Sequence, residues 1–152
     1  DIARQMLRHR SFSFQEFSQR YAEPSALTDE YILREARLQD HKNRQNSIAT
    51  DDEELQNWFD YQQHYIQFAA KQVYHEAIAK GIAKEQARIV LPEGLTMSRL
   101  YMSGTIRSWV HYCSLRSAHG TQLEHTDIAK QIANILKEQY PLSGEQLFPS
   151  QQ

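Results

Sequence analysis

Cysteine is almost absent from this sequence, and long apolar runs are missing altogether. The single cysteine among the 152 residues, Cys113, excludes an internal disulfide bond and fits a reducing compartment. No apolar run approaches the roughly 20 residues that a helix needs to span a bilayer. A secretion signal is not seen either. We therefore expect a cytoplasmic protein that has no membrane partner.

An excess of charge of either sign is also missing. The formal net charge is -2, which argues against bulk affinity for nucleic acid. Hydrophobic residues make up 40% of the chain and the mean hydropathy is -0.71, so the core should be modest. The length suits one domain, and we expect residues 1–152 to form it.

Several familiar site motifs are absent. There is no glycine-rich phosphate loop and no dinucleotide fingerprint. The seven histidines show neither the HExxH spacing nor a pairing with cysteines, so we expect no metal site. Cys113 falls on the apolar side of a predicted helix, which favours a buried structural thiol over a nucleophile.

The hydrophobic pattern predicts a chain that is mostly helical. We expect a strand over 95–102, a strand or loop at 11–14, and an exposed loop or frayed helix over the polar stretch 39–49. Thr50 and Glu53 suggest a capping box for the longest helix, which Gly81 should end. The helices are expected over residues 1–9, about 53–80, 83–88, 105–115 and 122–140.

The longest predicted helix carries an unusual number of aromatic residues. Such a helix usually packs in a core or at a subunit interface. Its apolar stripe comprises Leu55, Phe59, Ile66, Ala70, Val73 and Ala77, widened by Trp58, Tyr61, Tyr65 and Phe68. The last two helices should turn inward Ile106, Trp109, Val110 and Cys113 in one, and Ile128, Ile132, Ile135 and Leu136 in the other.

Arginine is concentrated near the start of the chain. Arg4, Arg8, Arg10 and Arg20 face only two acidic residues in the first 20 positions. Guanidinium groups suit the recognition of a phosphate or diphosphate, because they offer several donors in one plane. Composition alone is equally compatible with a solvated basic face.

The spacing within this basic segment resembles a known signature. Arg8-His9-Arg10 is followed after seven residues by Ser18 and then by Arg20-Tyr21, which resembles the signature of flavin-dependent thymidylate synthases. A second block agrees with that family in order and spacing. It comprises Arg88-Ile89-Val90-Leu91-Pro92, Ile106-Arg107-Ser108-Trp109, Leu115-Arg116 and Gln122-Leu123-Glu124. The two blocks cover most of the chain outside residues 24–52.

The resemblance implies an activity and a fold. Members of the family convert dUMP to dTMP with methylenetetrahydrofolate as carbon donor and FAD, reduced by NADPH, as reductant. They are homotetramers whose active sites are shared between subunits. The implied fold is α/β of the α+β type, with helices packed on a mainly antiparallel sheet. The chain would be the central and C-terminal part of such an enzyme, lacking the N-terminal portion.

The resemblance also implies roles for individual residues. Arg116 would face the uracil and favour ionisation at its N3, which makes it the candidate catalytic residue. Arg88 would reach in from a neighbouring subunit. The implied dUMP contacts are Gln5, Arg8, Glu16, Phe17, Ser18, Gln19, Arg20, Arg88 and Arg116. The implied FAD contacts are Arg8, His9, Arg10, Gln15, Glu16, Thr105, Ile106, Arg107 and His111.

Three positions depart from the family pattern, and three alternatives remain open. Gln15 stands where the family often has asparagine, as do Thr105 and His111 in some members; all can still form hydrogen bonds. The first alternative is a related flavin- and folate-dependent change to a pyrimidine nucleotide, such as hydroxymethylation. The second is a non-catalytic module that binds a nucleotide or nucleic acid. The third is a fragment that folds only with further sequence or partner chains.

Overall fold

The computed structural model describes residues 2–16 and 32–148. These residues fall into two compact units, and the single domain expected from the sequence stays a prediction. We call the unit formed by Gln15–Arg37 and Ala49–Tyr101 the long-helix unit. The unit formed by Ile2–Phe14, Leu38–Ile48 and Met102–Gln152 is the helical-core unit. None of the helices within the described residues is long and apolar enough to cross a membrane.

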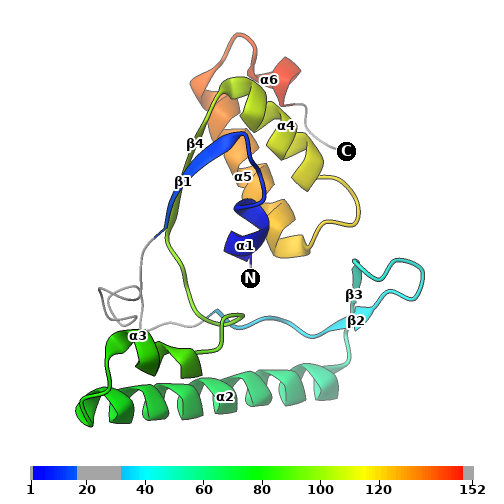
Figure 1. The fold of residues 1–152 in the computed structure, drawn as a ribbon. Helices are drawn as coiled ribbons and strands as arrows, with labels where there is room; N and C mark the ends of the chain where they lie inside the picture. The colour runs from blue at the N-terminus through cyan, green and yellow to red at the C-terminus, as the bar shows by residue number, and fades with distance from the viewer. Residues whose placement is uncertain (1, 17–31, 149–152) are drawn as a thin grey trace. The chain divides into compact units, whose positions relative to one another are not determined.

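The helical-core unit is built mainly from helices near the C-terminus. The helix α4 packs beside α5, and α5 packs against α6 (Figure 1). Thr105 begins α4 by accepting a hydrogen bond from the backbone N–H of Ser108 at 3.3 Å. The predicted helices over 105–115 and 122–140 are confirmed. The helices of this unit are α1 (Ile2–Met6), α4 (Ile106–Arg116), α5 (Leu123–Gln139) and α6 (Gly144–Leu147).

The core of this unit joins residues from β1, α4 and α5 with the residue that follows α6. Its buried members are Phe12, Tyr112, Cys113, Ala129 and Phe148. Cys113 is thus a buried free thiol, as predicted, and burial raises its pKa to about 11.

The prediction for one core residue of α5 is wrong. Ile135 was expected to point inward but is 57% exposed. The buried stripe of α5 instead follows His125, Ala129, Ile132 and Leu136 at helical spacing, and Ile135 lies to one side of it.

The strands form two small sheets. Strand β1 (Phe12–Glu16) pairs with β4 (Leu100–Gly104), and β2 (Arg37–Gln39) pairs with β3 (Ser47–Ala49). Helices with antiparallel strands confirm the predicted fold class. β4 starts later than the predicted strand over 95–102, because a turn that ties the N–H and hydroxyl of Thr96 to the Pro92 carbonyl comes first.

The polar stretch 39–49 holds the turn of the β2–β3 hairpin. The Asp40 carboxylate accepts hydrogen bonds from the backbone N–H groups of Lys42 and Asn43 at 2.8 and 3.1 Å. These hydrogen bonds lower the pKa of the Asp40 carboxyl, and the bond from Asn43 has the largest effect. The loop is therefore organised by one side chain although most of its residues are exposed.

The long-helix unit is dominated by α2 (Glu53–Ala79). The predicted capping box is wrong: Asp52 is the N-cap and accepts from the N–H of Leu55 at 3.0 Å, whereas the Thr50 hydroxyl accepts from the N–H of Asp52. Gly81, at a φ of 82°, follows the helix end as predicted. The short helices α3 (Lys84–Ala87) and η2 (Arg88–Val90) pack against α2.

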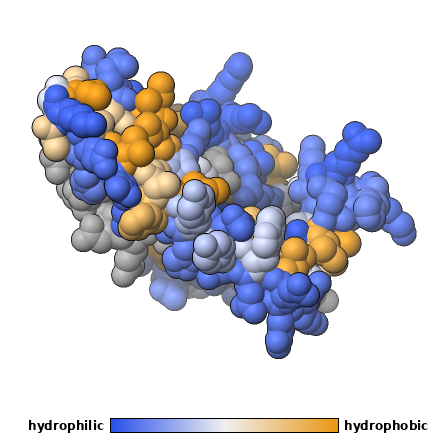
Figure 2. All heavy atoms as spheres, turned by 90° about the horizontal axis from the view of Figure 1, so that it is seen from below, coloured by the Kyte–Doolittle hydropathy of each residue, from blue (hydrophilic) through white to orange (hydrophobic). Residues whose placement is uncertain are grey.

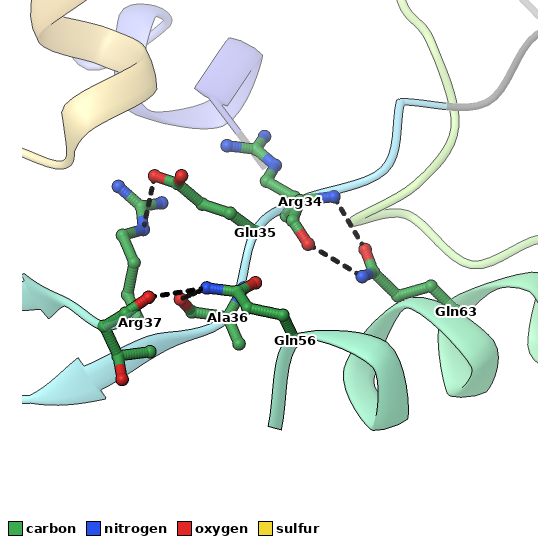
Figure 3. A network of polar contacts seen from close by, with 7 residues as sticks. Arg34, Glu35, Ala36, Arg37, Gln56 and Gln63 are labelled. Atoms are coloured by element: carbon green, nitrogen blue, oxygen red, sulfur yellow. Dashed lines mark hydrogen bonds and ion pairs between the residues drawn. The ribbon is translucent and has the colours of Figure 1, made fainter. Parts of the chain in front are cut away.

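Two glutamines of α2 hold an extended segment of the same unit (Figure 3). Gln63 accepts from the N–H of Arg34 and donates to its carbonyl, both at 2.8 Å. Gln56 does the same for Ala36, at 2.8 and 2.9 Å. Because each amide satisfies both polar groups of one residue, the two side chains act as a strand would.

Many aromatic side chains of α2 are exposed in the described part of the chain. The described residues bury only Gln63, Ala70 and Tyr74 of the helix, so the apolar stripe predicted from the sequence does not form a closed core here. Figure 2, seen from below, shows apolar side chains in separate groups on a surface that is mostly hydrophilic. Large hydrophobic residues are exposed on α2, on η2 and just before α3. They are Trp58, Tyr61, Tyr65, Ile66, Phe68, Val73, Ile82, Ile89 and Val90.

Candidate functional site

The helical-core unit brings together residues from both ends of the chain that the sequence singled out. Gln5 lies in α1, and Arg8, His9 and Arg10 follow it in a turn. Thr105 caps α4, which also carries Ile106, Arg107, His111 and Arg116.

Other predicted site residues lie elsewhere. Gln15 and Glu16 end β1, where the Ser98 hydroxyl donates to the Glu16 carboxylate at 2.9 Å. Arg88 lies in η2 of the long-helix unit, and its Nε donates to the Glu85 carbonyl at 3.3 Å. Phe17, Ser18, Gln19 and Arg20 lie outside the described residues.

Arg116 is held by a histidine of the signature triplet. Its Nε donates to Nε2 of His9 at 2.8 Å, although 107 positions separate the two residues. The His9 ring is buried and meets Tyr112 edge-on at 4.9 Å between centroids. Because Nε2 accepts, the proton of a neutral His9 must sit on Nδ1. Burial lowers the pKa of His9, and the charge of Arg116 lowers it further.

A second set of hydrogen bonds runs beside this pair. The Tyr112 hydroxyl and Nε2 of His125 lie 2.9 Å apart, and both residues are fully buried. Nδ1 of His125 lies 3.1 Å from Oε1 of Gln5, whose Nε2 donates to Gln122 at 2.7 Å. Burial, with the nearby charge of Arg116, lowers the pKa of His125 to about 4. Both histidines are therefore neutral near pH 7, and Arg116 is the cation beside them.

A cavity opens next to α4. It measures about 510 Å³ and is lined by Ile106, Arg107, Val110, His111, Ser114 and Leu147. Three of these lining residues, Ile106, Arg107 and His111, are among the predicted FAD contacts. Apolar walls with one guanidinium and one imidazole suit an aromatic nucleotide cofactor that carries phosphates.

The three residues of the signature triplet Arg8-His9-Arg10 differ in burial. His9 is buried, whereas Arg8 and Arg10 are exposed. The triplet therefore contributes one internal partner for Arg116 and two guanidinium groups that face outward. Within residues 2–16 and 32–148, no group of three or more His, Cys, Asp or Glu is placed to hold a metal ion.

Sequence reasoning missed Tyr112, His125 and the role of Gln122. A signal for His125 was present, since it shares the helical stripe of Ala129, Ile132 and Leu136 on α5. A histidine on an apolar face needs a buried partner. The partner could not be read from the pattern, because Tyr112 and Gln5 come from two other helices.

Comparison with known proteins finds relatives of one family. Residues 1–142 match the family described as thymidylate synthase complementing protein. The chain is 49% identical over 140 residues to a probable flavin-dependent thymidylate synthase of Paramecium bursaria Chlorella virus 1. It is 51% identical over 140 residues to a flavin-dependent thymidylate synthase of Synechocystis sp.. Each match covers 92% of this chain and 63% of the relative, so the chain spans less than two thirds of their length.

A solved structure has the same fold. The UMP/dUMP methylase PolB from Streptomyces cacaoi, bound with 5-Br UMP, superposes with a TM-score of 0.80 at 27% identity. The superposition covers 95% of this chain and 67% of that one. The match of the family over residues 1–142, together with these relatives, shows that this chain belongs to the thymidylate synthase complementing protein family, that of the flavin-dependent thymidylate synthases.

Proposed function

We propose that the protein is a cytoplasmic flavin-dependent thymidylate synthase that methylates dUMP reductively to dTMP. Methylenetetrahydrofolate is the carbon donor, and FAD reduced by NADPH is the reductant. The names of the relatives support a flavin enzyme, and the substrate of PolB supports a uracil nucleotide. The observation that carries the proposal is the guanidinium of Arg116, oriented at 2.8 Å by a neutral, buried histidine.

The chemistry of Arg116 follows from its surroundings. A guanidinium beside the N3 edge of uracil stabilises negative charge on the ring, which makes C5 more nucleophilic. The lone pair on Nε2 of His9 accepts the hydrogen bond from Arg116, and the neutral ring adds no positive charge. The positive charge that stabilises the anionic uracil is therefore that of Arg116. His9 also fixes the angle of the guanidinium plane, which reduces the reorganisation needed when charge develops.

The cavity beside α4 is the proposed flavin site of this chain. Arg107 and His111 would hold the phosphates of FAD, and Ile106 would contribute an apolar wall. FAD, when bound, supplies the reducing equivalents of the reaction. Arg8 and Arg10, which are exposed, have their guanidinium groups accessible for further contacts to cofactor or nucleotide.

We also propose a homotetramer with shared active sites. The uncovered aromatic face of α2 supports assembly, because apolar patches of this kind mark protein–protein contacts. Arg88 and the four residues at positions 17–20 would complete the nucleotide site of the assembly.

The proposal is tested by substitution of Arg116. Arg116→Ala should lower kcat by about a hundredfold or more, because it removes a charge that is used only as the ring becomes anionic. The visible spectrum should still show bound flavin, and mass analysis of the wild-type product should show a methyl group on the uracil.

A matched control is Arg44→Ala, since Arg44 is an exposed arginine of the β2–β3 loop. Its kcat should stay at the wild-type value. Near-normal turnover by Arg116→Ala would remove Arg116 from the mechanism, and a hydroxymethyl product would replace the proposed reaction with a related one.

A further inference from the structure

One wall of the cavity beside α4 lies outside the family match. Leu147, the last residue of α6, lines this cavity, and every other lining residue in the described part of the chain belongs to α4. Without Leu147, one face of a single helix would remain. The family match covers residues 1–142, whereas α6 begins at Gly144. The second wall of the proposed flavin cavity is therefore contributed by residues that the match does not include.

Leu147 also lines a second cavity, of about 350 Å³. This cavity is lined by residues of α4, α5 and α6 and by the residue that follows α6. It shares Val110, Ser114 and Leu147 with the cavity beside α4. A shift of α6 away from α5 would therefore open the first cavity toward the second.

Gly144 sets how closely α6 approaches α5. A Cβ atom at this position would lie 2.7 Å from Cα of Lys137 and 2.8 Å from its carbonyl oxygen. Both atoms belong to the main chain of α5, which cannot move aside like the end of a side chain. An ion pair between Nζ of Lys137 and the Glu145 carboxylate, at 3.4 Å, joins the two helices at the same place. Only glycine at position 144 therefore allows the present contact between α6 and α5.

The other end of α6 is anchored in the core. Phe148, which follows Leu147, is 3% exposed and belongs to the cluster of Tyr112 and Cys113. Its N–H donates to the Gly144 carbonyl at 2.8 Å. Leu147 is therefore held between a glycine contact on one side and a buried aromatic ring on the other.

We propose that Leu147 binds the flavin cofactor and that Gly144 is the residue that positions it. The inference rests on the proposed function, which assigns the cavity beside α4 to FAD. Arg107 and His111 supply polar groups of this site for the phosphates, and Leu147 supplies apolar surface for a ring of the same cofactor. The affinity of the protein for FAD therefore depends on a helix that the family signature does not specify.

The direct test is Leu147→Ala. The dissociation constant of FAD is measured by flavin fluorescence during titration of the whole protein, freed of flavin beforehand. The constant should rise about five- to twentyfold, because the variant removes apolar contact area. Leu142→Ala is the matched control, since Leu142 lies just before α6 but is 98% exposed and lines neither cavity. Its constant should equal that of the wild type.

Gly144→Ala tests the positioning role. The added methyl group must push α6 away from α5, so the constant should rise at least as far as in Leu147→Ala. Gly94→Ala is its control, because a Cβ at Gly94 meets no atom beyond its chain neighbours within 4 Å. In the double variant Gly144→Ala/Leu147→Ala, the constant should stay close to that of Gly144→Ala alone, since a displaced wall has no contact left to lose. A purely structural role of Gly144 would instead make the two effects multiply.

The outcomes separate this inference from the proposed function. If Leu147→Ala binds FAD as tightly as the wild type, or if Leu142→Ala weakens binding equally, α6 is not a wall of the flavin site, and the proposed function stands without it. Effects that multiply in the double variant would remove the positioning role of Gly144. A wild-type protein that does not bind FAD would overturn the proposed function, and the inference would fall with it.

Discussion

Two phenylalanines of this chain have opposite environments. Phe12, in the helical-core unit, is 8% exposed and lies within 4.7 Å of Trp109 between ring centroids. Phe68, on α2 of the long-helix unit, is 70% exposed. One unit therefore closes its core with its own aromatic residues, whereas the other presents them outward. Among the described residues, the chain therefore completes one core internally and leaves aromatic side chains of α2 exposed, as the proposed assembly requires.

Removal of the buried phenylalanine should break the first unit. Phe12→Ala should lower the free energy of unfolding by about 3–5 kcal/mol, because it leaves a cavity among Trp109, Tyr112 and Gly104. Urea denaturation of the variant and the wild type would measure the loss. A loss below about 1 kcal/mol would mean that this core is looser than its contacts indicate.

The buried histidines of the same unit predict a dependence on pH. His9 and His125 have folded pKa values below that of an unfolded histidine, about 4 for His125. Their contribution to stability is therefore complete above about pH 6.5 and is lost as the pH falls, since only the unfolded chain then binds the protons. The free energy of unfolding should fall by up to about 1.4 kcal/mol per pH unit for each histidine.

Denaturation at several pH values between 6.5 and 4 would measure this slope. His125→Leu should flatten it by one proton, whereas Phe148→Leu should lower stability and keep the slope. An equal slope in wild type and His125→Leu would show that His125 is not held neutral.

Substitution of the exposed phenylalanine should sharpen the contrast. Phe68→Ala should change the free energy of unfolding of the separated subunit by no more than about 0.5 kcal/mol, because the side chain has little to lose there. It should, however, shift the assembly toward smaller species in light scattering at equal protein concentration. A variant that destabilises the subunit as strongly as Phe12→Ala would indicate that α2 packs within its own chain.

Local signals explain which parts of the fold were predictable. The end of α2 and the span of α4 follow from Gly81 and from Thr105, residues that act within one turn of their own position. The resemblance listed Arg116 and residues of the first block as contacts of one nucleotide, but the bond from Arg116 to His9 was not predicted. The N-cap was missed because Thr50 with Glu53 fits the capping-box pattern, whereas Asp52 caps the helix with Leu55 at the third position and forms no such box.

The remaining features depend on contacts between distant segments. The bond between His125 and Gln5 joins residues 120 positions apart, and that between Gln63 and Arg34 joins residues 29 apart. A periodic pattern within one helix shows that a polar residue faces inward but not what it meets. The inward direction of Ile135 was inferred from helical periodicity, and it was wrong because Ile135 lies beside the stripe that α5 buries.

The two glutamines that hold residues 34 and 36 have a consequence for natural variation. They contact only main-chain atoms, so they place no demand on the side chains of the held segment. Substitutions that fit the space at each position would keep these bonds. Proline is the exception, because it has no N–H for Oε1 of Gln63 or Gln56 to accept. Related chains that keep both glutamines should therefore avoid proline at these two positions, and position 36 should also keep a small residue, because Ala36 is buried.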